Sequence, residues 1–199
     1  MNLPTKITVS RILLIPIMIA VYCCKSVFDY YYIVATAIFV LASCTDFIDG
    51  HIARSRNMVT DLGKFLDPIA DKILVVVGMI MLMGMQVLPD YFGVITISII
   101  LSREFIIGVF RQIAASKGCV LAADKLGKAK TIVTCTAIPM LMLAPLAAPS
   151  IKIVAIHYIG LVFYWGGLAL FLIATLLTVV SGINYILKNK TVLQDKKES

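Results

Sequence analysis

DFIDGHIAR at residues 46–54 and GKFLDPIADK at residues 63–72 place four aspartates where two long apolar runs meet. One apolar run ends near residue 44 and the other begins near residue 73, so Asp46, Asp49, Asp67 and Asp71 lie at the edge of a hydrophobic layer. On a helix, residues 46, 49, 50, 53 and 54 share one face, and residues 63, 67 and 71 share another. Two helices can therefore direct four carboxylates at one small volume.

These carboxylates require cations. Left unpaired, four neighbouring anions would repel one another by several kcal/mol at reduced dielectric. Hard oxygen ligands, with no nearby pair of Cys or His, favour Mg²⁺ or Mn²⁺ over zinc. The alternative interpretation is a solvated polar loop between two membrane helices. Ionisable groups on shared helical faces at a membrane edge are nevertheless typical of a functional site.

Composition identifies the class of protein. Of 199 residues, 60% are hydrophobic and 15% are charged, and the mean hydropathy is +0.98. These values lie outside the range of ordinary soluble domains. The formal charge is +7, but the basic residues lie at the ends of apolar segments and form no patch interleaved with aromatics. This distribution argues against nucleic acid and favours anionic lipids and phosphates as partners. We therefore predict a single all-α integral membrane domain over residues 1–199.

Six apolar segments reach the length of about 20 residues that crosses a bilayer. They cover residues 6–24, 30–53, 64–87, 91–116, 126–148 and 153–187. Residues 1–11 are amphipathic and are predicted to lie on the headgroup surface, and residues 188–199 form a polar cytoplasmic tail. If the amino terminus is cytoplasmic, only Lys25 and Lys152 of eighteen basic residues fall outside. We therefore predict a multi-pass plasma-membrane protein whose aspartates face the cytoplasm.

Charged residues also occur inside the fourth apolar segment. SREFIIGVFR at residues 102–111 contains Arg103, Glu104 and Arg111, which must find partners in the bundle interior or a wet cavity. One interpretation is structural pairing of an arginine with Glu104 or with the aspartates. The other is a phosphate-binding pocket, to which Lys128 and Lys130 of GKAKT, residues 127–131, would add charge. These lysines are equally compatible with a flanking charge that sets membrane orientation.

The complete pattern, D-x2-D-G-x2-A-R-x8-G-x3-D-x3-D, resembles the signature of the CDP-alcohol phosphotransferase family at every fixed position. The resemblance implies that an alcohol attacks the β-phosphorus of a CDP-activated lipid and that CMP leaves. It implies two Mg²⁺ or Mn²⁺ ions held by the four aspartates, with Asp71 also acting as general base. The residues that it implies for binding the CDP-lipid are Thr5, Asp46, Asp49, Gly50, Ala53, Arg54 and Gly63.

The acceptor alcohol is a separate question, because the signature is shared by enzymes that use inositol phosphate, serine, choline and glycerol phosphate. Residues 2–131 resemble bacterial members that make phosphatidylglycerophosphate. A cationic pocket would also suit a phosphate dianion. The residues predicted to form it are Arg11, Arg103, Arg111, Lys128 and Lys130. We therefore expect CDP-diacylglycerol as donor, sn-glycerol 3-phosphate as acceptor and, by family analogy, a homodimer.

Two alternatives remain open. The first is the same reaction with another polar acceptor, namely inositol phosphate, serine or phosphatidylglycerol. The second belongs to another class, a divalent-cation transporter lined by the same carboxylates. A transporter needs a continuous polar path, and the outer halves of the apolar segments contain almost no ionisable residues.

Overall fold

The computed structural model describes residues 3–56, 61–116, 125–149, 151 and 153–189. For residues 3–7, 46–56, 61–68, 71 and 125 it describes the backbone alone. The described residues form six α-helices and two short 3-10 helices and contain no strand, which confirms the all-α prediction. The elements are α1 (Leu3–Cys23), η1 (Cys24–Ser26), α2 (Tyr31–Arg56), α3 (Asp61–Gly84), α4 (Asp90–Ser116), α5 (Lys125–Met142), η2 (Ala144–Ala147) and α6 (Val154–Lys188).

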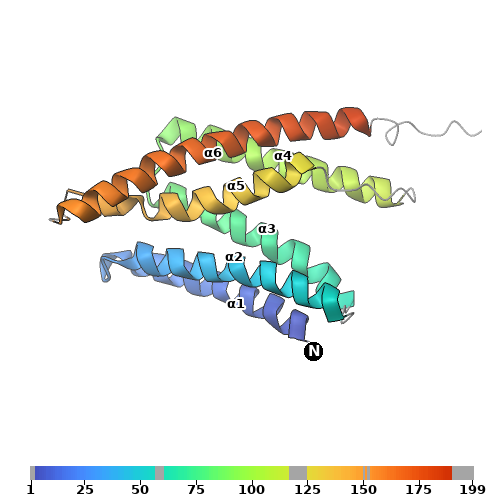
Figure 1. Ribbon diagram of the computed structural model, residues 1–199, viewed down its shortest axis with the longest axis horizontal. Coiled ribbons are helices and arrows are strands. Elements are labelled where there is room, and N and C mark those ends of the chain that lie inside the picture. Colours follow the sequence, from blue (N-terminus) through green and yellow to red (C-terminus); the bar gives the residue numbers. More distant parts are fainter. Residues whose placement is uncertain (1–2, 57–60, 117–124, 150, 152, 190–199) are drawn as a thin grey trace, which may run out of the picture.

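The helices alternate in direction along one elongated bundle (Figure 1). The first turns of α1, α3 and α5 and the last turns of α2, α4 and α6 lie at the same end, on the right in Figure 1. We call residues 46–54 and 63–72 the two acidic segments. Both lie at this end, because the first is at the end of α2 and the second is at the start of α3. We call this the motif end of the bundle.

Four stretches are long and apolar enough to cross a membrane, namely Thr8–Ser26, Asp90–Ser116, Leu126–Ala147 and Val154–Lys188. The last, α6, has 35 residues and is about 52 Å long, well beyond the roughly 30 Å of a bilayer's hydrocarbon core. In α2 and α3 the apolar stretches are shorter, Tyr31–Thr45 and Lys72–Gly84, because the acidic segments occupy the remaining turns. The prediction of membrane helices is thus confirmed for four of the six.

The amino-terminal segment is continuous with the first apolar span. Residues 3–11 form the first turns of α1, and the side chains of Thr8 and Arg11 are buried against the protein. The placement of residues 1–11 at the headgroup surface stays a prediction.

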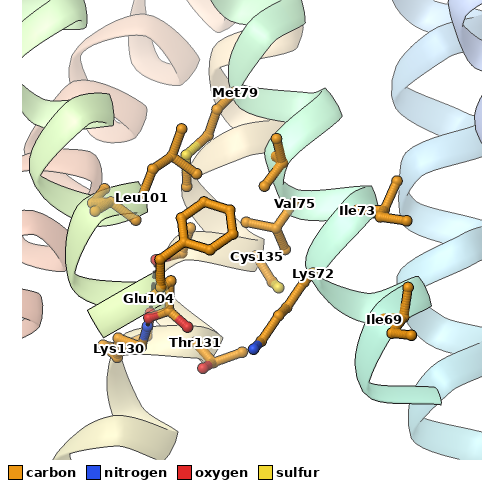
Figure 2. A pocket seen from close by; sticks show the side chains of 14 residues that line it. Ile69, Lys72, Ile73, Val75, Met79, Leu101, Glu104, Lys130, Thr131 and Cys135 are labelled. Carbon is orange, nitrogen blue, oxygen red and sulfur yellow. Dashed lines mark hydrogen bonds and ion pairs between the residues drawn. The ribbon is translucent and has the colours of Figure 1, made fainter. Parts of the chain in front are cut away.

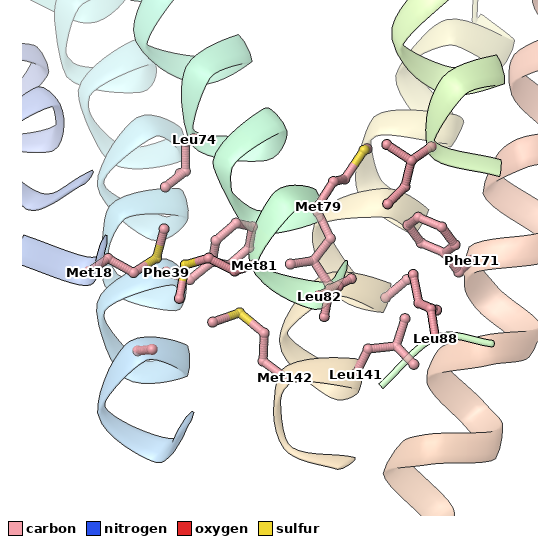
Figure 3. Packing of buried hydrophobic residues seen from close by; sticks show 14 of the residues in the cluster. Met18, Phe39, Leu74, Met79, Met81, Leu82, Leu88, Leu141, Met142 and Phe171 are labelled. Atoms are coloured by element: carbon pink, nitrogen blue, oxygen red, sulfur yellow. The ribbon is translucent and has the colours of Figure 1, made fainter. Parts of the chain in front are cut away.

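The core runs across the whole bundle, from α1 and α2 on one side to α6 on the other (Figure 3). Its centre is α3, whose apolar side chains contact those of α2 and α5. The fully buried members include Met18, Phe39, Leu74, Met79, Leu82, Leu141 and Phe171. Large side chains exposed elsewhere, such as Trp165 and Val162 of α6, are those expected against lipid.

Five buried threonine hydroxyls are satisfied inside single helices. Each of five threonines donates a hydrogen bond to the carbonyl four residues earlier, at 2.6–2.9 Å. They are Thr36, Thr96, Thr134, Thr175 and Thr178. Because lipid offers no hydrogen bonds, this local pairing lets a polar residue lie within an apolar bundle.

A glycine allows the start of α6 to lie directly against η2. A Cβ atom placed at Gly160 would lie 2.8 Å from the Cα of Ala147 and even closer to the backbone nitrogen of that residue. At Gly166 a Cβ would instead meet the terminal methyl of Met140, at 2.9 Å. A side-chain tip can move away at little cost, whereas a helical backbone cannot.

We therefore expect Gly160→Ala to lower the free energy of unfolding by about 1–3 kcal/mol, the usual cost of overpacking. Gly166→Ala in the same helix should change it much less, since the alanine gains helix propensity while Met140 adjusts. Thermal unfolding of detergent-solubilised protein measures both variants. Equal melting temperatures for the two would contradict the close approach of α6 and η2.

Candidate functional site

The aspartates of the signature lie on two helices that meet at the motif end. Asp46 and Asp49 belong to the last turns of α2, and Asp67 and Asp71 belong to the first turns of α3 (Figure 1). Their side chains lie outside those that the structure describes, so the four-carboxylate metal site stays a prediction. The set consists entirely of carboxylates, which fits Mg²⁺ or Mn²⁺. Among the described side chains, no group of three or more His, Cys, Asp and Glu could hold a metal ion.

Arg11 ties α1 to the helix that bears the first acidic segment. Its side chain is fully buried, and its Nε donates a hydrogen bond to the carbonyl of Ala42 at 3.2 Å. The hydroxyl of Thr45 donates to the same carbonyl at 2.8 Å. Ala42 precedes Asp46 by one helical turn, so Arg11 lies between α1 and α2 and orients the helix that carries the aspartates. Its predicted part in the acceptor pocket stays a prediction.

Glu104 of α4 binds two of those cations. Its Oε1 accepts a hydrogen bond from Arg103 Nη1 at 2.9 Å, and it also pairs with Lys130 Nζ of α5 (Figure 2). Lys130 is buried, with 7% of its surface exposed. The pairing of Arg103 with Glu104 confirms one interpretation made from the sequence. It also joins α4 to α5 at the motif end.

The last helix, α6, holds Arg103 from its other side. Arg103 Nη2 donates to the hydroxyl of Ser181 at 2.9 Å, and Ser181 in turn donates to the carbonyl of Thr178 at 3.2 Å. The stem of Arg103 lies against Gly182, where a Cβ would be only 3.0 Å from Arg103 Cγ. A small residue at this position therefore lets the guanidinium pass between the two helices.

Arg111 contacts the same helix one turn further along. Its Nε donates to the hydroxyl of Tyr185 at 3.1 Å, and its guanidinium carbon lies 5.1 Å from the centre of the Tyr185 ring. Tyr185 is buried, and Phe110 packs edge-on against it. The tyrosine therefore fixes Arg111 by a hydrogen bond and a cation–π contact, while the arginine as a whole stays exposed.

A cavity of about 350 Å³ opens between α3, α4 and α5 (Figure 2). Glu104, Lys130 and Thr131 line one end together with Lys72 of α3. The remaining lining is almost entirely apolar, ending near Met79. The charged end of the cavity thus belongs to the motif end of the bundle.

Lys128, another residue predicted for the acceptor pocket, is exposed on α5 and is not part of the Glu104 cluster. The remaining predicted site residues lie in helices, but their side chains are not described. They are Thr5, Gly50, Ala53, Arg54 and Gly63. Their roles stay predictions.

Sequence reasoning missed three residues that the structure places in this region, Lys72, Ser181 and Tyr185. Lys72 follows Asp71 directly in the sequence, and no role was predicted for it. Ser181 and Tyr185 lie in a strongly apolar segment, and their only signal was a spacing of four that puts two polar groups on one helical face. Nothing local indicates that this face meets the arginines of α4.

Comparison with known proteins gives one family and several relatives. A family model described as CDP-alcohol phosphatidyltransferase matches residues 1–180. Three similar curated proteins all carry the name CDP-diacylglycerol–glycerol-3-phosphate 3-phosphatidyltransferase. The protein from Bacillus subtilis (strain 168) is 36% identical over 200 residues, covering 94% of this chain and 95% of its own. That from Rickettsia bellii (strain RML369-C) is 35% identical, covering 92% and 93%. That from Salmonella typhimurium (strain LT2) is 30% identical, covering 93% of each chain.

The Glu104 cluster predicts a measurable coupling between α4 and α5. Glu104→Gln leaves Arg103 and Lys130 without their shared anion. We expect the free energy of unfolding to fall by about 1–2 kcal/mol. This is less than for a deeply buried pair, because 30% of the Glu104 side chain is exposed. A double-mutant cycle with Lys130→Met, followed by thermal unfolding, measures the interaction. Asp90→Asn, an exposed acid in the first turn of α4, is the control. Additive effects of the two cluster mutations would show that the ion pair contributes nothing.

Proposed function

Because the chain belongs to the CDP-alcohol phosphatidyltransferase family, we propose that it transfers a phosphatidyl group from CDP-diacylglycerol to sn-glycerol 3-phosphate. The products are phosphatidylglycerophosphate and CMP. As a member of this family the protein is a phospholipid-synthesising transferase with several candidate membrane helices.

The observation that carries the acceptor assignment is the charge balance beside the cavity. Arg103, Arg111 and Lys130 are gathered on α4 and α5, and the carboxylate described among them is Glu104. Among the described side chains, these three cations outnumber the one carboxylate, which suits a phosphate dianion. Within the described residues, the Nε of Arg103 is buried and makes no hydrogen bond, which leaves a donor unused. An uncharged alcohol would offer these donors no charge-assisted contact.

The carboxylates of the acidic segments would hold two divalent cations, Mg²⁺ or Mn²⁺. Bound there, such ions would neutralise the pyrophosphate of the donor and polarise its phosphorus. Asp46, Asp49 and Asp67 act as ligands in this proposal, and Asp71 combines ligation with proton transfer. Gly50, Ala53 and Gly63 lack bulk, so a nucleotide can lie close to both helices, with Thr5 and Arg54 beside it.

Each substrate group then meets a residue with a defined task. Asp71 accepts the proton of the acceptor hydroxyl as the oxygen bonds to the β-phosphorus, and the bond to CMP breaks. Arg103, Arg111 and Lys130 hold the acceptor's phosphate, and Ser181 and Tyr185 hold the arginines. Lys128 and Arg11 would add positive charge to the acceptor pocket, and Arg11 also holds α2 through the carbonyl of Ala42. Fixing both substrates in this way lowers the entropic part of the barrier.

The proposal includes a membrane arrangement. All six helices cross the bilayer within one domain, and the motif end faces the cytoplasm, where soluble glycerol 3-phosphate is available. The basic residues at this end support that orientation. A homodimer is proposed by family analogy. Family membership favours the transferase over a cation transporter.

An acceptor panel tests the reaction. Purified protein with Mg²⁺ and CDP-diacylglycerol should release CMP with sn-glycerol 3-phosphate and release far less with serine, inositol phosphate, phosphatidylglycerol or plain glycerol. Asp71→Asn should bind the donor and be slower by about 10²- to 10⁴-fold, since it cannot take the proton. Faster CMP release with another acceptor would overturn the glycerol-phosphate assignment and leave the transferase intact. Metal-dependent ion uptake into vesicles without CMP release would overturn the transferase itself.

The acceptor pocket makes a kinetic prediction. Arg111→Ala should raise the KM for glycerol 3-phosphate by about ten- to a hundredfold, because a charge-assisted contact to phosphate is lost, and should leave the KM for CDP-diacylglycerol nearly unchanged. Tyr185→Phe should raise the acceptor KM by about two- to tenfold, since only the hydrogen bond that positions Arg111 is removed.

Tyr164→Phe is the matched control in the same helix, where the tyrosine packs edge-on against Trp165 away from the arginines. Its KM values should equal those of the wild type. An unchanged acceptor KM in both Arg111→Ala and Tyr185→Phe would remove the arginine from the acceptor pocket.

A further inference from the structure

The cavity between α3, α4 and α5 has the dimensions and polarity of a site for a lipid chain. Along α3 it extends from Ile69 to Met79, ten residues or about 15 Å of helix. That length is half of the roughly 30 Å hydrocarbon core, the depth of a single leaflet. The apolar stretch of α3 begins at Lys72, so the charged end of the cavity coincides with the boundary of that stretch.

Polar groups occur mainly at that boundary. Figure 2 shows the ends of Lys72, Glu104, Lys130 and Thr131 at one end of the cavity and Met79 at the other. Lys72 reaches across from α3 to α4, since a Cβ placed at Gly108 would lie 3.3 Å from its Nζ. Glu104 is already paired with Arg103 and Lys130, so the Lys72 amine suits a further anion at the mouth.

The inner wall offers little to a water-soluble ligand. The hydroxyl of Thr134 donates to the carbonyl of Lys130 at 2.8 Å, and that of Thr131 donates to the carbonyl of Gly127 at 3.1 Å. Both hydroxyls are therefore occupied within α5. The other groups deeper in the cavity are chiefly aliphatic side chains and the sulfur atoms of methionine and cysteine. Such a wall favours hydrocarbon over a polar molecule.

The cavity is also accessible from the side. Ile69 and Ile73 of α3 and Phe105 of α4 line it, and their exposed fractions are 39%, 41% and 68%. A hydrocarbon chain can therefore enter from the bilayer between α3 and α4. Because lipid already solvates such a chain, burial alone provides no driving force, and the contribution of the cavity is shape and position.

We propose that this cavity receives one acyl chain of the phosphatidyl donor and that its depth sets which chain lengths are used. This inference rests on the proposed function. The Lys72 amine lies beside the phosphate-bearing end of the lipid, one residue after Asp71, and the chain extends along α3 toward Met79. The pocket thus places the donor's phosphate at the motif end by holding its tail.

The test fills the cavity. Val76→Phe puts a ring into the lining of α3 and should lower kcat/KM for CDP-dioleoylglycerol by about tenfold or more, the effect expected when a shaped apolar pocket rejects excess volume. Turnover of CDP-dihexanoylglycerol, whose shorter chains fill less of the cavity, should fall much less. Ile80→Phe, a lipid-facing position in the same helix, is the control and should alter neither substrate.

A second measurement uses the wild-type protein and does not depend on folding of a variant. A CDP-diacylglycerol analogue with a diazirine at the end of one acyl chain should label the deep lining, residues 75–79, 100–101 or 134–135. Labelling confined to α1, α2 or α6 would overturn the proposal. Equal loss of both substrates in Val76→Phe would also overturn it, and a change of oligomeric state in that variant would identify a second copy of the chain as the occupant.

These outcomes are distinct from failure of the proposed reaction. If the wild type releases CMP with neither chain length, the transferase is wrong. If it releases CMP with both and Val76→Phe does not discriminate between them, the reaction stands and the acyl site falls. The experiment is repeated with protein stripped of co-purifying phospholipid. If Val76→Phe still lowers turnover of the long-chain donor more than that of the short-chain donor, the donor is the occupant of the cavity. If this difference disappears, the cavity belongs to a resident lipid and the proposal is overturned.

Discussion

Glu104 lies between two cations in a junction of apolar helices, and its carboxylate links α4 to α5 there. An arginine or a buried lysine in such surroundings is costly without an anion, so Arg103 and Lys130 must both approach it. Lys130 thereby draws the start of α5 toward α4. The hydrogen bond from Arg103 to Ser181 extends the same network to α6. The contacts of Glu104 and Arg103 therefore connect three helices, α4, α5 and α6.

A separate contact organises the other half of the bundle. Arg11 binds the carbonyl of Ala42, one turn before the first aspartate, and so connects α1 to α2. Between the two halves lies α3, which carries the second acidic segment and packs at the centre of the core. Because α3 contacts both halves, residues that are far apart in the sequence reach the same end of the molecule. The proposed phosphatidyl transfer requires residues from these distant segments to lie at the same end of the bundle.

The reaction proposed here must bring together a lipid and a soluble phosphate. In this proposal the cationic cluster on α4 and α5 would bind the phosphate, and the apolar cavity between α3, α4 and α5 would hold the lipid. Lys130 and Glu104 belong to both. The two substrates would consequently meet across a single ion pair, next to the helix that bears Asp67 and Asp71. Pairing between Arg103, Glu104 and Lys130 accounts for the charges within these apolar segments.

The sequence by itself determined the family, the all-helical class and the approximate bounds of every helix. These properties are local, because apolar runs of membrane length and a fixed spacing of aspartates need no knowledge of neighbours. The same local pattern identified Arg103, Glu104, Arg111 and Lys130 as residues in need of partners. Only the tertiary structure decided which partners they have. Ser181 lies 78 residues beyond Arg103 and Tyr185 lies 74 residues beyond Arg111, and Arg11 binds a carbonyl of α2. Residues 3–11 form the first turns of α1, in which Thr8 and Arg11 are buried against the protein. Contacts between distant segments depend on how whole helices pack, and a one-dimensional pattern holds no record of that packing.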